Sequence, residues 1–251
     1  MVLVEDDGTR RKTACVTGGN GYIASALIKM LLEKGYAVKT TVRKPNDMAK
    51  NSHLKDLQAL GPLQVFCADL EEEGSFDDAI AGCNYAFLVA APSNLDPQNP
   101  EKDLIEPAVQ GTLNVMRSCH RVAVLLSLLS GDDAMASILG HIEMSSGSIS
   151  VVHVDDLCRT EILLAEKETA SGRFICCSLN TTAVALARFL ALKYPQYNVK
   201  TDRFGGLPEK PKVCISSAKL VGEGFQFKQD TLDKIYDGAV QYGRALGILP
   251  Y

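Results

Sequence analysis

Apolar and polar residues alternate along the first half of the chain in blocks that fit strands and helices in turn. Short apolar runs at 13–17, 36–42, 63–67 and 85–90 predict four strands. Helical spacing of apolar residues between and after them predicts helices at 22–34, 54–60, 75–80 and 107–119, with Ser75 as the N-cap of the third. Strands that alternate with helices are typical of βαβ units, so the sequence predicts an α/β fold with a doubly wound parallel sheet.

The second half of the chain follows a less regular pattern. We expect strands at 148–153, 173–177 and 212–215, and helices at 154–167, 182–193 and 231–246. The apolar run at 122–126 fits a buried parallel strand in a fifth place of the sheet, while 125–129 fits a helix equally well. We therefore predict a nucleotide-binding part at 1–121, and at 122–251 the remainder of the sheet with a smaller C-terminal α/β substrate region.

Composition and charge exclude several classes of protein. Of the 251 residues, 46% are hydrophobic and 22% are charged, which is typical of a folded globular chain rather than a disordered one. A net charge of −4 without a basic run argues against a nucleic-acid partner. No apolar stretch reaches the roughly 18 residues of a membrane span, and the N-terminus does not resemble a signal peptide. The eight cysteines have neither C-x-x-C nor zinc spacing, so we expect no metal site and a reducing compartment, the cytoplasm.

The most informative segment is the glycine-rich turn between the first strand and the first helix. Gly18, Gly19, Asn20 and Gly21 form this turn, and Tyr22 and Ile23 open the helix. Glycines allow a tight turn and close backbone approach to a pyrophosphate, and a helix N-terminus favours negative charge. In this strand–turn–helix context the segment predicts a dinucleotide-binding fold of the Rossmann type.

The residues after the second strand indicate which dinucleotide binds. An acidic residue there would favour NAD, but this chain has Arg43 and Lys44, with Lys50 a little further on. These cations suit the 2′-phosphate of NADP(H), which we therefore predict as the cofactor. The ends of the third and fourth strands complete the predicted cofactor site, with the residues Asp69, Leu70, Val89, Ala90, Ala91 and Pro92.

These motifs together resemble the plant flavonoid reductases of the extended short-chain dehydrogenase/reductase superfamily. In the first half the resemblance rests on residues 18–24, 41–43, 68–70, 89–92 and 111–115. In the second half it rests on residues 146–150, 153–158, 165–168, 170–173, 175–177, 194–197, 215–217 and 219–221, which are most similar to the anthocyanidin-reducing branch. The resemblance covers nearly the whole chain. It implies NADPH-dependent reduction of a small flavonoid substrate, an anthocyanidin, to a flavan-3-ol in proanthocyanidin biosynthesis.

One part of the family pattern is missing. Members of this superfamily carry a Tyr-x-x-x-Lys pair on one face of a helix, and none of the eight tyrosines here has Lys four positions later. The missing strand, catalytic helix and following strand amount to on the order of 80 residues. We place the join at 121–122 and name no catalytic residue.

The missing pair leaves alternatives open. They are a catalytically silent protein that binds NADP or a partner, an unstable shortened isoform, and an enzyme of the dihydroflavonol reductase type, against which the C-terminal motifs argue. The four histidines have no partner visible in the sequence, so we expect packing or surface positions for them. Asp155 and Asp156 open a helix, where carboxylates favour the helix dipole.

Overall fold

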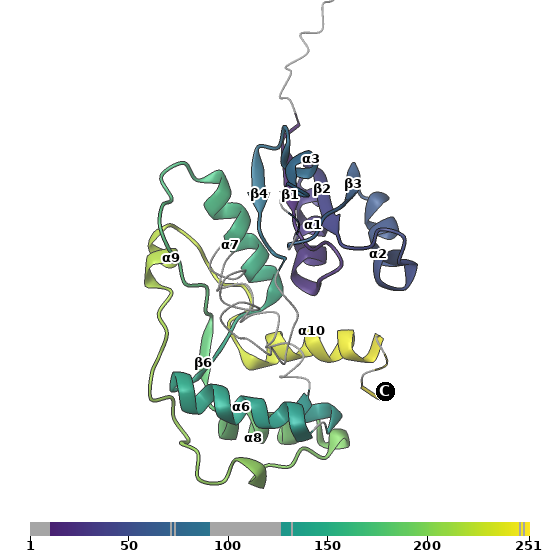
Figure 1. Cartoon of the computed structure of the whole chain (residues 1–251). Coiled ribbons are helices and arrows are strands. Elements are labelled where there is room, and N and C mark those ends of the chain that lie inside the picture. Colours follow the sequence, from purple (N-terminus) through teal and green to yellow (C-terminus); the bar gives the residue numbers. More distant parts are fainter. Residues whose placement is uncertain are drawn as a thin grey trace, which may run out of the picture. The chain divides into compact units, whose positions relative to one another are not determined.

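The structure is a computed structural model, and it describes residues 11–70, 72, 74–90, 127–131, 133–245, 247 and 249–251. The chain divides into two compact units, Met1–Val115 and Met116–Tyr251. Figure 1 draws the described part of the first in purple to blue and that of the second in teal to yellow. The helix predicted at 107–119, the strand predicted at 122–126 and the boundary predicted at 121–122 lie outside the described residues. Residues 127–130, directly after them, are helical.

The first unit contains a four-stranded parallel sheet, which confirms the predicted fold class. Its strands are β1 (Thr13–Val16), β2 (Ala37–Val42), β3 (Leu63–Cys67) and β4 (Tyr85–Phe87), in the order β3-β2-β1-β4. Because β2 and β4 lie on opposite sides of β1, the direction of the connections reverses there, and ligands of such sheets bind at this reversal. β4 ends at Phe87 rather than at residue 90, because the amides of Val89 and Ala90 donate to the Thr17 hydroxyl instead of to a neighbouring strand.

The helices of the first unit cover the sheet. The helix α1 (Tyr22–Glu33) packs on β1 and β2 through a buried stripe that includes Ile23, Leu27 and Leu31. The helix α2 (Met48–Gln58) starts earlier than predicted because Asp47 caps it, accepting a hydrogen bond from the Lys50 amide at 3.3 Å. The connection from β1 to β2 contains α1, and the connection from β3 back across the sheet to β4 contains α3 (Asp77–Ile80). Because both crossovers are right-handed and run in opposite directions, α1 and α3 lie on opposite faces of the sheet.

Ser75 does not cap α3, contrary to the prediction. The hydroxyl of Ser75 accepts a hydrogen bond from the Asp69 amide at 3.1 Å and donates one to the Asp69 carbonyl at 2.9 Å. The N-cap position belongs to Phe76, whose side chain makes no capping hydrogen bond. Ser75 therefore closes the loop after β3 instead of starting the helix.

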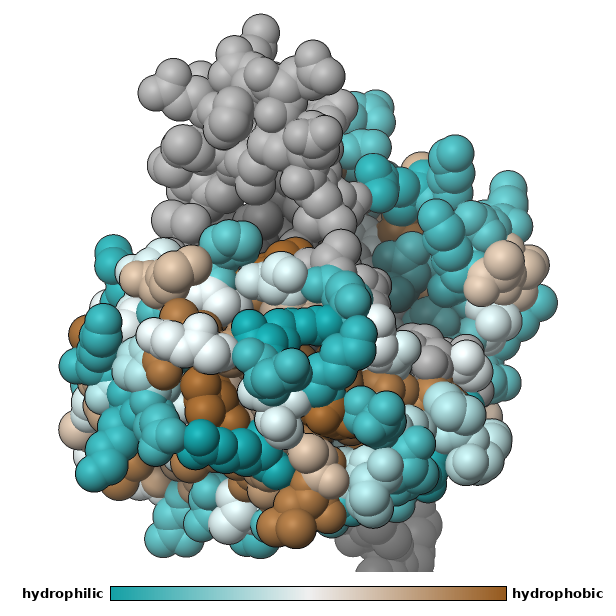
Figure 2. All heavy atoms as spheres, turned by 90° about the horizontal axis from the view of Figure 1, so that it is seen from below, coloured by the Kyte–Doolittle hydropathy of each residue, from teal (hydrophilic) through white to brown (hydrophobic). Residues whose placement is uncertain are grey.

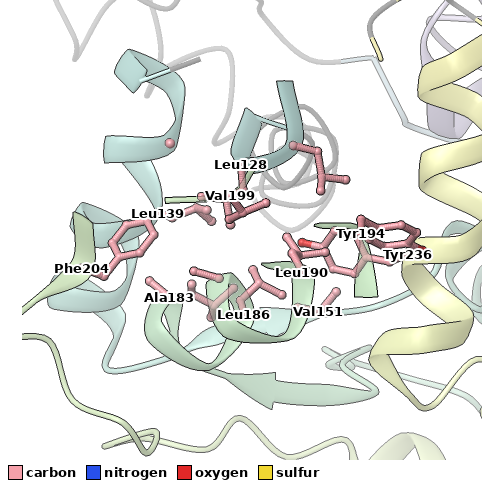
Figure 3. Close-up of a cluster of buried hydrophobic side chains, with 14 of the residues drawn as sticks. Leu128, Leu139, Val151, Ala183, Leu186, Leu190, Tyr194, Val199, Phe204 and Tyr236 are labelled. Atoms are coloured by element: carbon pink, nitrogen blue, oxygen red, sulfur yellow. The ribbon is translucent and has the colours of Figure 1, made fainter. Parts of the chain in front are cut away.

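The second unit is a layer of helices around a short antiparallel pair of strands. Its elements are α6 (Asp133–Ser146), β5 (Ile149–Val151), α7 (Val154–Glu166), β6 (Leu179–Thr181), α8 (Ala183–Lys193), η2 (Pro195–Tyr197), η3 (Asp202–Phe204), α9 (Ala218–Gly222) and α10 (Leu232–Ala245). β5 and β6 pair with each other, so in the described residues they do not continue the parallel sheet as predicted. Leu139 from α6, Leu186 and Leu190 from α8 and Tyr236 from α10 meet in the buried core (Figure 3).

Two predicted strands of the second unit are wrong, and the helices α6 and α9 and the strand β6 were not predicted. Residues 173–177 are not a strand, because the Ser217 hydroxyl takes both backbone groups of Cys177: it accepts from the amide at 2.8 Å and donates to the carbonyl at 2.9 Å. Residues 212–215 are also irregular, since the amides of Lys212 and Val213 share the Gly147 carbonyl. Of the two missed helices, α6 is the longer, with 14 residues against 5 in α9.

The surface of the described residues shows no broad apolar area in the view of Figure 2, where apolar side chains lie between polar ones. Leu192 and Met144 are the most exposed large aliphatic side chains among the described residues, at 86% and 64%. No helix in the described part of the chain has the length and apolar character needed to cross a membrane.

Candidate cofactor site

Thr17 joins the ends of β1 and β4 at the carboxyl edge of the sheet. The residue is 2% exposed, and its amide donates to the Phe87 carbonyl at 3.0 Å. Its Oγ1 accepts hydrogen bonds from the amides of Val89 at 3.0 Å and Ala90 at 2.9 Å. One buried hydroxyl therefore fixes the chain after β4 against the start of the glycine-rich turn.

Gly18 and Gly19 are held by the end of β2. The Gly18 amide donates to Thr41 Oγ1 at 3.2 Å, and the Gly19 amide donates to the Thr41 carbonyl at 2.8 Å. Gly18 has φ +72°, and a Cβ there would lie 3.0 Å from the Ala90 Cα. A Cβ on Gly19 would lie 2.2 Å from Thr40 Oγ1. Neighbouring strand ends therefore require both glycines.

Gly21 is the glycine with an open side toward solvent. It is exposed, and the one atom that an added Cβ would meet within 4 Å is the Gly18 carbonyl oxygen, at 3.2 Å. Its amide donates to the same oxygen at 2.8 Å, which closes the turn just before α1 begins at Tyr22. Asn20 is also exposed, whereas Ile23 and Ala24 are buried against the sheet. The turn thus combines an open glycine with a helix N-terminus, the arrangement that pyrophosphates require.

The three predicted cations lie around the turn after β2. Arg43, Lys44 and Lys50 are all exposed, and within the described part of the chain none of their side chains forms an ion pair. The Cys67 thiol, at the end of β3, donates to the Arg43 carbonyl at 3.3 Å, which places the turn beside the next strand end. Two guanidinium or ammonium groups next to each other without a carboxylate partner suit a phosphate.

The other predicted site residues occupy the same edge of the sheet where the structure describes them. Asp69 is half-buried and Leu70 is 45% exposed, both directly after β3. Val89 is 8% exposed and Ala90 is half-buried, next to Gly18. Ala91 and Pro92 lie outside the described residues. The carboxyl ends of β1, β2, β3 and β4 therefore bring thirteen of the fifteen predicted residues to one edge.

Sequence reasoning missed several polar side chains that shape this edge. Thr17, Thr40 and Thr41 were read as strand residues, and their hydrogen bonds appear only when neighbouring strands are in register. His53 was expected to be a packing or surface residue, but its Nε2 lies 2.9 Å from Ser25 Oγ on α1. The one signal in the sequence was the position of Thr17 directly before the glycines.

A tyrosine–lysine pair in the first unit lies at the wrong edge of the sheet. Lys12 Nζ donates to Tyr85 Oη at 3.1 Å, but Lys12 precedes β1 and Tyr85 begins β4. Parallel strands start at the edge opposite to the glycine turn, about 13 Å away along a four-residue strand. This pair therefore cannot serve a group bound at the turn.

Tyr194 in the second unit is paired in a way that keeps its proton in place. Its hydroxyl donates to Asp237 Oδ1 at 2.7 Å, and Lys193 Nζ lies 2.7 Å from the same oxygen. Burial and the adjacent carboxylate raise the pKa of Tyr194 to about 12. Catalysis near neutral pH needs a donor pKa close to that pH, so this tyrosine is a poor proton donor.

Comparison with known proteins identifies the family. The model of the NAD dependent epimerase/dehydratase family matches residues 14–146, which includes the whole glycine turn. The chain belongs to that family. An anthocyanidin reductase of Vitis vinifera is 38% identical, with 95% of this chain and 97% of that protein covered. The anthocyanidin reductase of Arabidopsis thaliana is 35% identical over 96% and 97%, and a dihydroflavonol 4-reductase of Callistephus chinensis is 31% identical over 95% and 88%.

Solved structures of family-like reductases have the same fold. Vestitone reductase from alfalfa matches with a TM-score of 0.67 and 24% identity, covering 95% of this chain and 100% of that one. A yeast methylglyoxal/isovaleraldehyde reductase complexed with NADPH matches with a TM-score of 0.66 and 15% identity, covering 94% and 100%. The predicted doubly wound α/β fold of this family is confirmed.

The alignment with the Vitis vinifera enzyme is longer than this chain. The alignment extends over 330 positions. This chain has 251 residues, and 95% of its residues are aligned. About 90 aligned positions therefore have no counterpart in this chain. This number is close to the length expected for the absent strand, catalytic helix and following strand. The location of the gap at 121–122 stays a prediction.

Proposed function

We propose that this chain binds NADP(H) at the carboxyl edge of the sheet in its first unit. The observation that carries the proposal is the glycine turn, in which Thr41 holds the amides of Gly18 and Gly19 while Gly21 faces solvent at the start of α1. Its fit to a pyrophosphate is steric as well as electrostatic, because a side chain at position 21 would occupy the open side of the turn. The family name and the NADPH complex of the yeast reductase support the same cofactor class.

In this proposal each strand end holds one part of the cofactor. Gly18, Gly19, Asn20 and Gly21 hold the pyrophosphate, together with the first turn of α1. Arg43 and Lys44, with Lys50, hold the 2′-phosphate, because they are exposed cations without ion-pair partners among the described residues. Asp69 and Leu70 line the adenine, and Val89 to Pro92 pass close to the rest of the dinucleotide. When bound, NADPH supplies a hydride.

We further propose that the reaction of this lineage is the reduction of anthocyanidins to flavan-3-ols, the precursors of proanthocyanidins. The support comes from the relatives, since anthocyanidin reductases are 35–38% identical to this chain and the dihydroflavonol 4-reductases 30–31%. The second candidate, dihydroflavonol reduction, is therefore less well supported. For the compartment we propose the cytosol, on the cysteine pattern of the sequence.

This particular chain should turn over slowly. General acid catalysis by a positioned donor is worth about 10²–10⁴-fold, and the chain carries no Tyr-x-x-x-Lys pair. The family resemblance implies that the lysine of this pair also holds the nicotinamide ribose. The losses from the missing tyrosine and the missing lysine are not multiplied, because effects within one catalytic unit are not additive. We therefore propose NADPH binding with reductase turnover at least about 100-fold below that of an intact relative.

Two measurements on the purified full chain test these proposals. Calorimetric titration with NADPH and NADH tests the cofactor. The Arg43→Ala/Lys44→Ala double variant should weaken NADPH by about 10-fold or more and leave NADH nearly unchanged, because charge-assisted hydrogen bonds contribute about 1.5–3 kcal/mol. Equal weakening of both cofactors would contradict the assignment of these cations to the 2′-phosphate.

NADPH consumption with cyanidin or delphinidin tests the reaction. The comparison is a version of the chain with the roughly 90 missing residues of the Vitis vinifera enzyme inserted at 121–122. Restored turnover in that version alone supports the proposal. Comparable rates would mean that another residue donates the proton. A chain that binds NADPH without turnover in either version would be a silent binding protein, and an aggregated chain would be an unstable isoform.

A further inference from the structure

The helix α2 carries two side chains that act on opposite ends of the proposed cofactor site. Asn51 and His53 are two residues apart near the middle of this helix. Asn51 reaches the turn after β2, and His53 reaches the glycine turn after β1. Neither belongs to the predicted set of cofactor-binding residues.

Asn51 fixes the backbone of the turn that contains the two adjacent cations. Its side chain is buried, with the residue 5% exposed. Nδ2 donates hydrogen bonds to the carbonyls of Lys44 at 2.7 Å and Pro45 at 3.2 Å. The Oδ1 atom is buried and has no partner among the described residues. The Asn51 side-chain amide therefore acts on this turn as a donor. Replacing it removes the hydrogen bond to the Pro45 carbonyl and leaves the Lys44 carbonyl with the Asp47 amide, at 3.1 Å.

His53 fixes the glycine turn through Ser25. The imidazole Nε2 lies 2.9 Å from Ser25 Oγ and 3.4 Å from the Gly19 carbonyl oxygen. Ser25 Oγ lies 3.0 Å from the Gly19 carbonyl and 2.8 Å from the Gly21 carbonyl. The Gly21 carbonyl also accepts from the Ser25 amide at 2.9 Å, whereas the contacts of the Gly19 carbonyl are Ser25 Oγ and His53 Nε2. In the tautomer with the proton on Nε2, the imidazole donates to this pair of acceptors.

The consequence for the turn follows from peptide geometry. The carbonyl and the next amide of a trans peptide point in opposite directions, so holding the Gly19 carbonyl also sets the direction of the Asn20 amide. Ser25 and His53 both contact that carbonyl from the side of α1 and α2. The Asn20 amide is then turned away from these helices.

We propose that Asn51 and His53 are positioning residues, each for a different phosphate of the dinucleotide. Asn51 positions the turn that binds the 2′-phosphate, and His53 with Ser25 positions the turn that binds the pyrophosphate. This inference rests on the proposed binding of NADP(H). It assigns α2 a part in cofactor selectivity, because one of its side chains acts on a group that NADH lacks.

Four ligands separate the two effects in calorimetric titrations of the full chain. ADP and NADH have the pyrophosphate without the 2′-phosphate, adenosine 2′-monophosphate has the 2′-phosphate without the pyrophosphate, and NADPH has both. His53→Ala should weaken ADP, NADH and NADPH by about 5-fold, the value of one lost hydrogen bond, and leave adenosine 2′-monophosphate within about 2-fold. Asn51→Ala should weaken NADPH and adenosine 2′-monophosphate and spare ADP and NADH.

Matched variants serve as controls. His53→Gln keeps a donor at a similar reach and should recover most of the affinity for ADP. Ser25→Ala should reproduce the pattern of His53→Ala, and the double variant should weaken ADP little further, because both residues act through one set of hydrogen bonds. The ratio of two dissociation constants measured on one preparation cancels any change in the folded fraction.

The outcomes distinguish this inference from the proposed function. If the unaltered chain does not bind NADPH, the proposed function is wrong and the inference fails with it. If the unaltered chain binds NADPH but each variant weakens all four ligands equally, only the inference fails, since uniform weakening is what a loss of general stability produces.

Discussion

Replacing Thr17 by valine should destabilise the first unit and loosen the edge that forms the proposed cofactor site. Valine has nearly the shape of threonine but lacks the oxygen. The change leaves the amides of Val89 and Ala90 without the acceptor that they share at 3.0 and 2.9 Å. Thr17 is 2% exposed and Val89 is 8% exposed, so solvent cannot readily replace that acceptor at Val89.

The expected loss follows from these exposures. A buried amide without a partner costs about 1–3 kcal/mol, and the half-buried Ala90 amide costs less because water reaches it, so the total is about 2–4 kcal/mol. Thr17→Ser is the matched control, because it keeps the oxygen and removes one methyl group worth about 1 kcal/mol. A domain of this kind has a free energy of unfolding of about 5–15 kcal/mol, so the difference in that free energy between the valine and serine variants is large enough to measure.

Urea unfolding followed by circular dichroism measures the free energy, and amide hydrogen exchange of peptides that cover residues 85–90 measures the local effect. The valine variant should unfold at lower urea concentration than the serine variant and should exchange faster at Val89 and Ala90. If the two variants share one unfolding midpoint and one exchange rate in this segment, the Thr17 hydroxyl does not hold β4, and the account of the edge is wrong.

Three further outcomes are expected. Asp156→Ala should lower the free energy of unfolding, measured in urea, by about 3–5 kcal/mol. The buried Asp156 carboxylate accepts from the amides of Lys228 and Gln229 and pairs with the Arg159 guanidinium. An effect below about 1 kcal/mol would contradict this. Thr182→Ala should cost about 1 kcal/mol more than Thr182→Ser, because both variants lose the same buried methyl group and only the alanine variant loses the N-cap of α8. Burial raises the pKa of Glu161 from 4.5 to about 7, so the folded chain keeps a proton that the unfolded chain releases, and stability falls as pH rises through this window. Glu161→Gln should flatten that fall, by up to about 3 kcal/mol between about pH 5 and about pH 8, and an unchanged pH profile would contradict the shift.

The sequence predicted the first sheet well because local signals and the final structure agree there. Short apolar runs separated by glycine-containing turns correspond to β1, β2 and β3 within a residue of their ends. The site edge was predicted for the same reason, since the carboxyl ends of parallel strands must meet. The supporting side chains could not be predicted, because Thr17 acts on Val89 and Ser25 on His53, at separations of 72 and 28 residues.

The second unit was harder because polar residues occupy its core. α6 buries Ala136 and Leu139, but the same face carries Glu143, which is 2% exposed and interrupts the apolar pattern. Glu143 is buried because its Oε2 accepts from the Ala183 amide at 2.7 Å and caps the start of α8. Residues 173–177 show the opposite error, since an apolar run typical of a strand finds its hydrogen bonds at Ser217 instead.

The family resemblance implies that binding of the cofactor and donation of the proton depend on different segments, and we propose that this chain separates them. The described contacts that shape the glycine turn and the neighbouring cationic turn join residues between 13 and 90. A segment lost at the predicted join, 121–122, therefore removes none of these contacts, while it removes the tyrosine and lysine that the family resemblance implies. Affinity for NADPH and turnover of a flavonoid then depend on different segments of the chain. The hydrogen bonds that hold a bound cofactor do not require a proton donor, which acts only in the transition state. We therefore propose that such a chain holds NADPH and turns it over slowly.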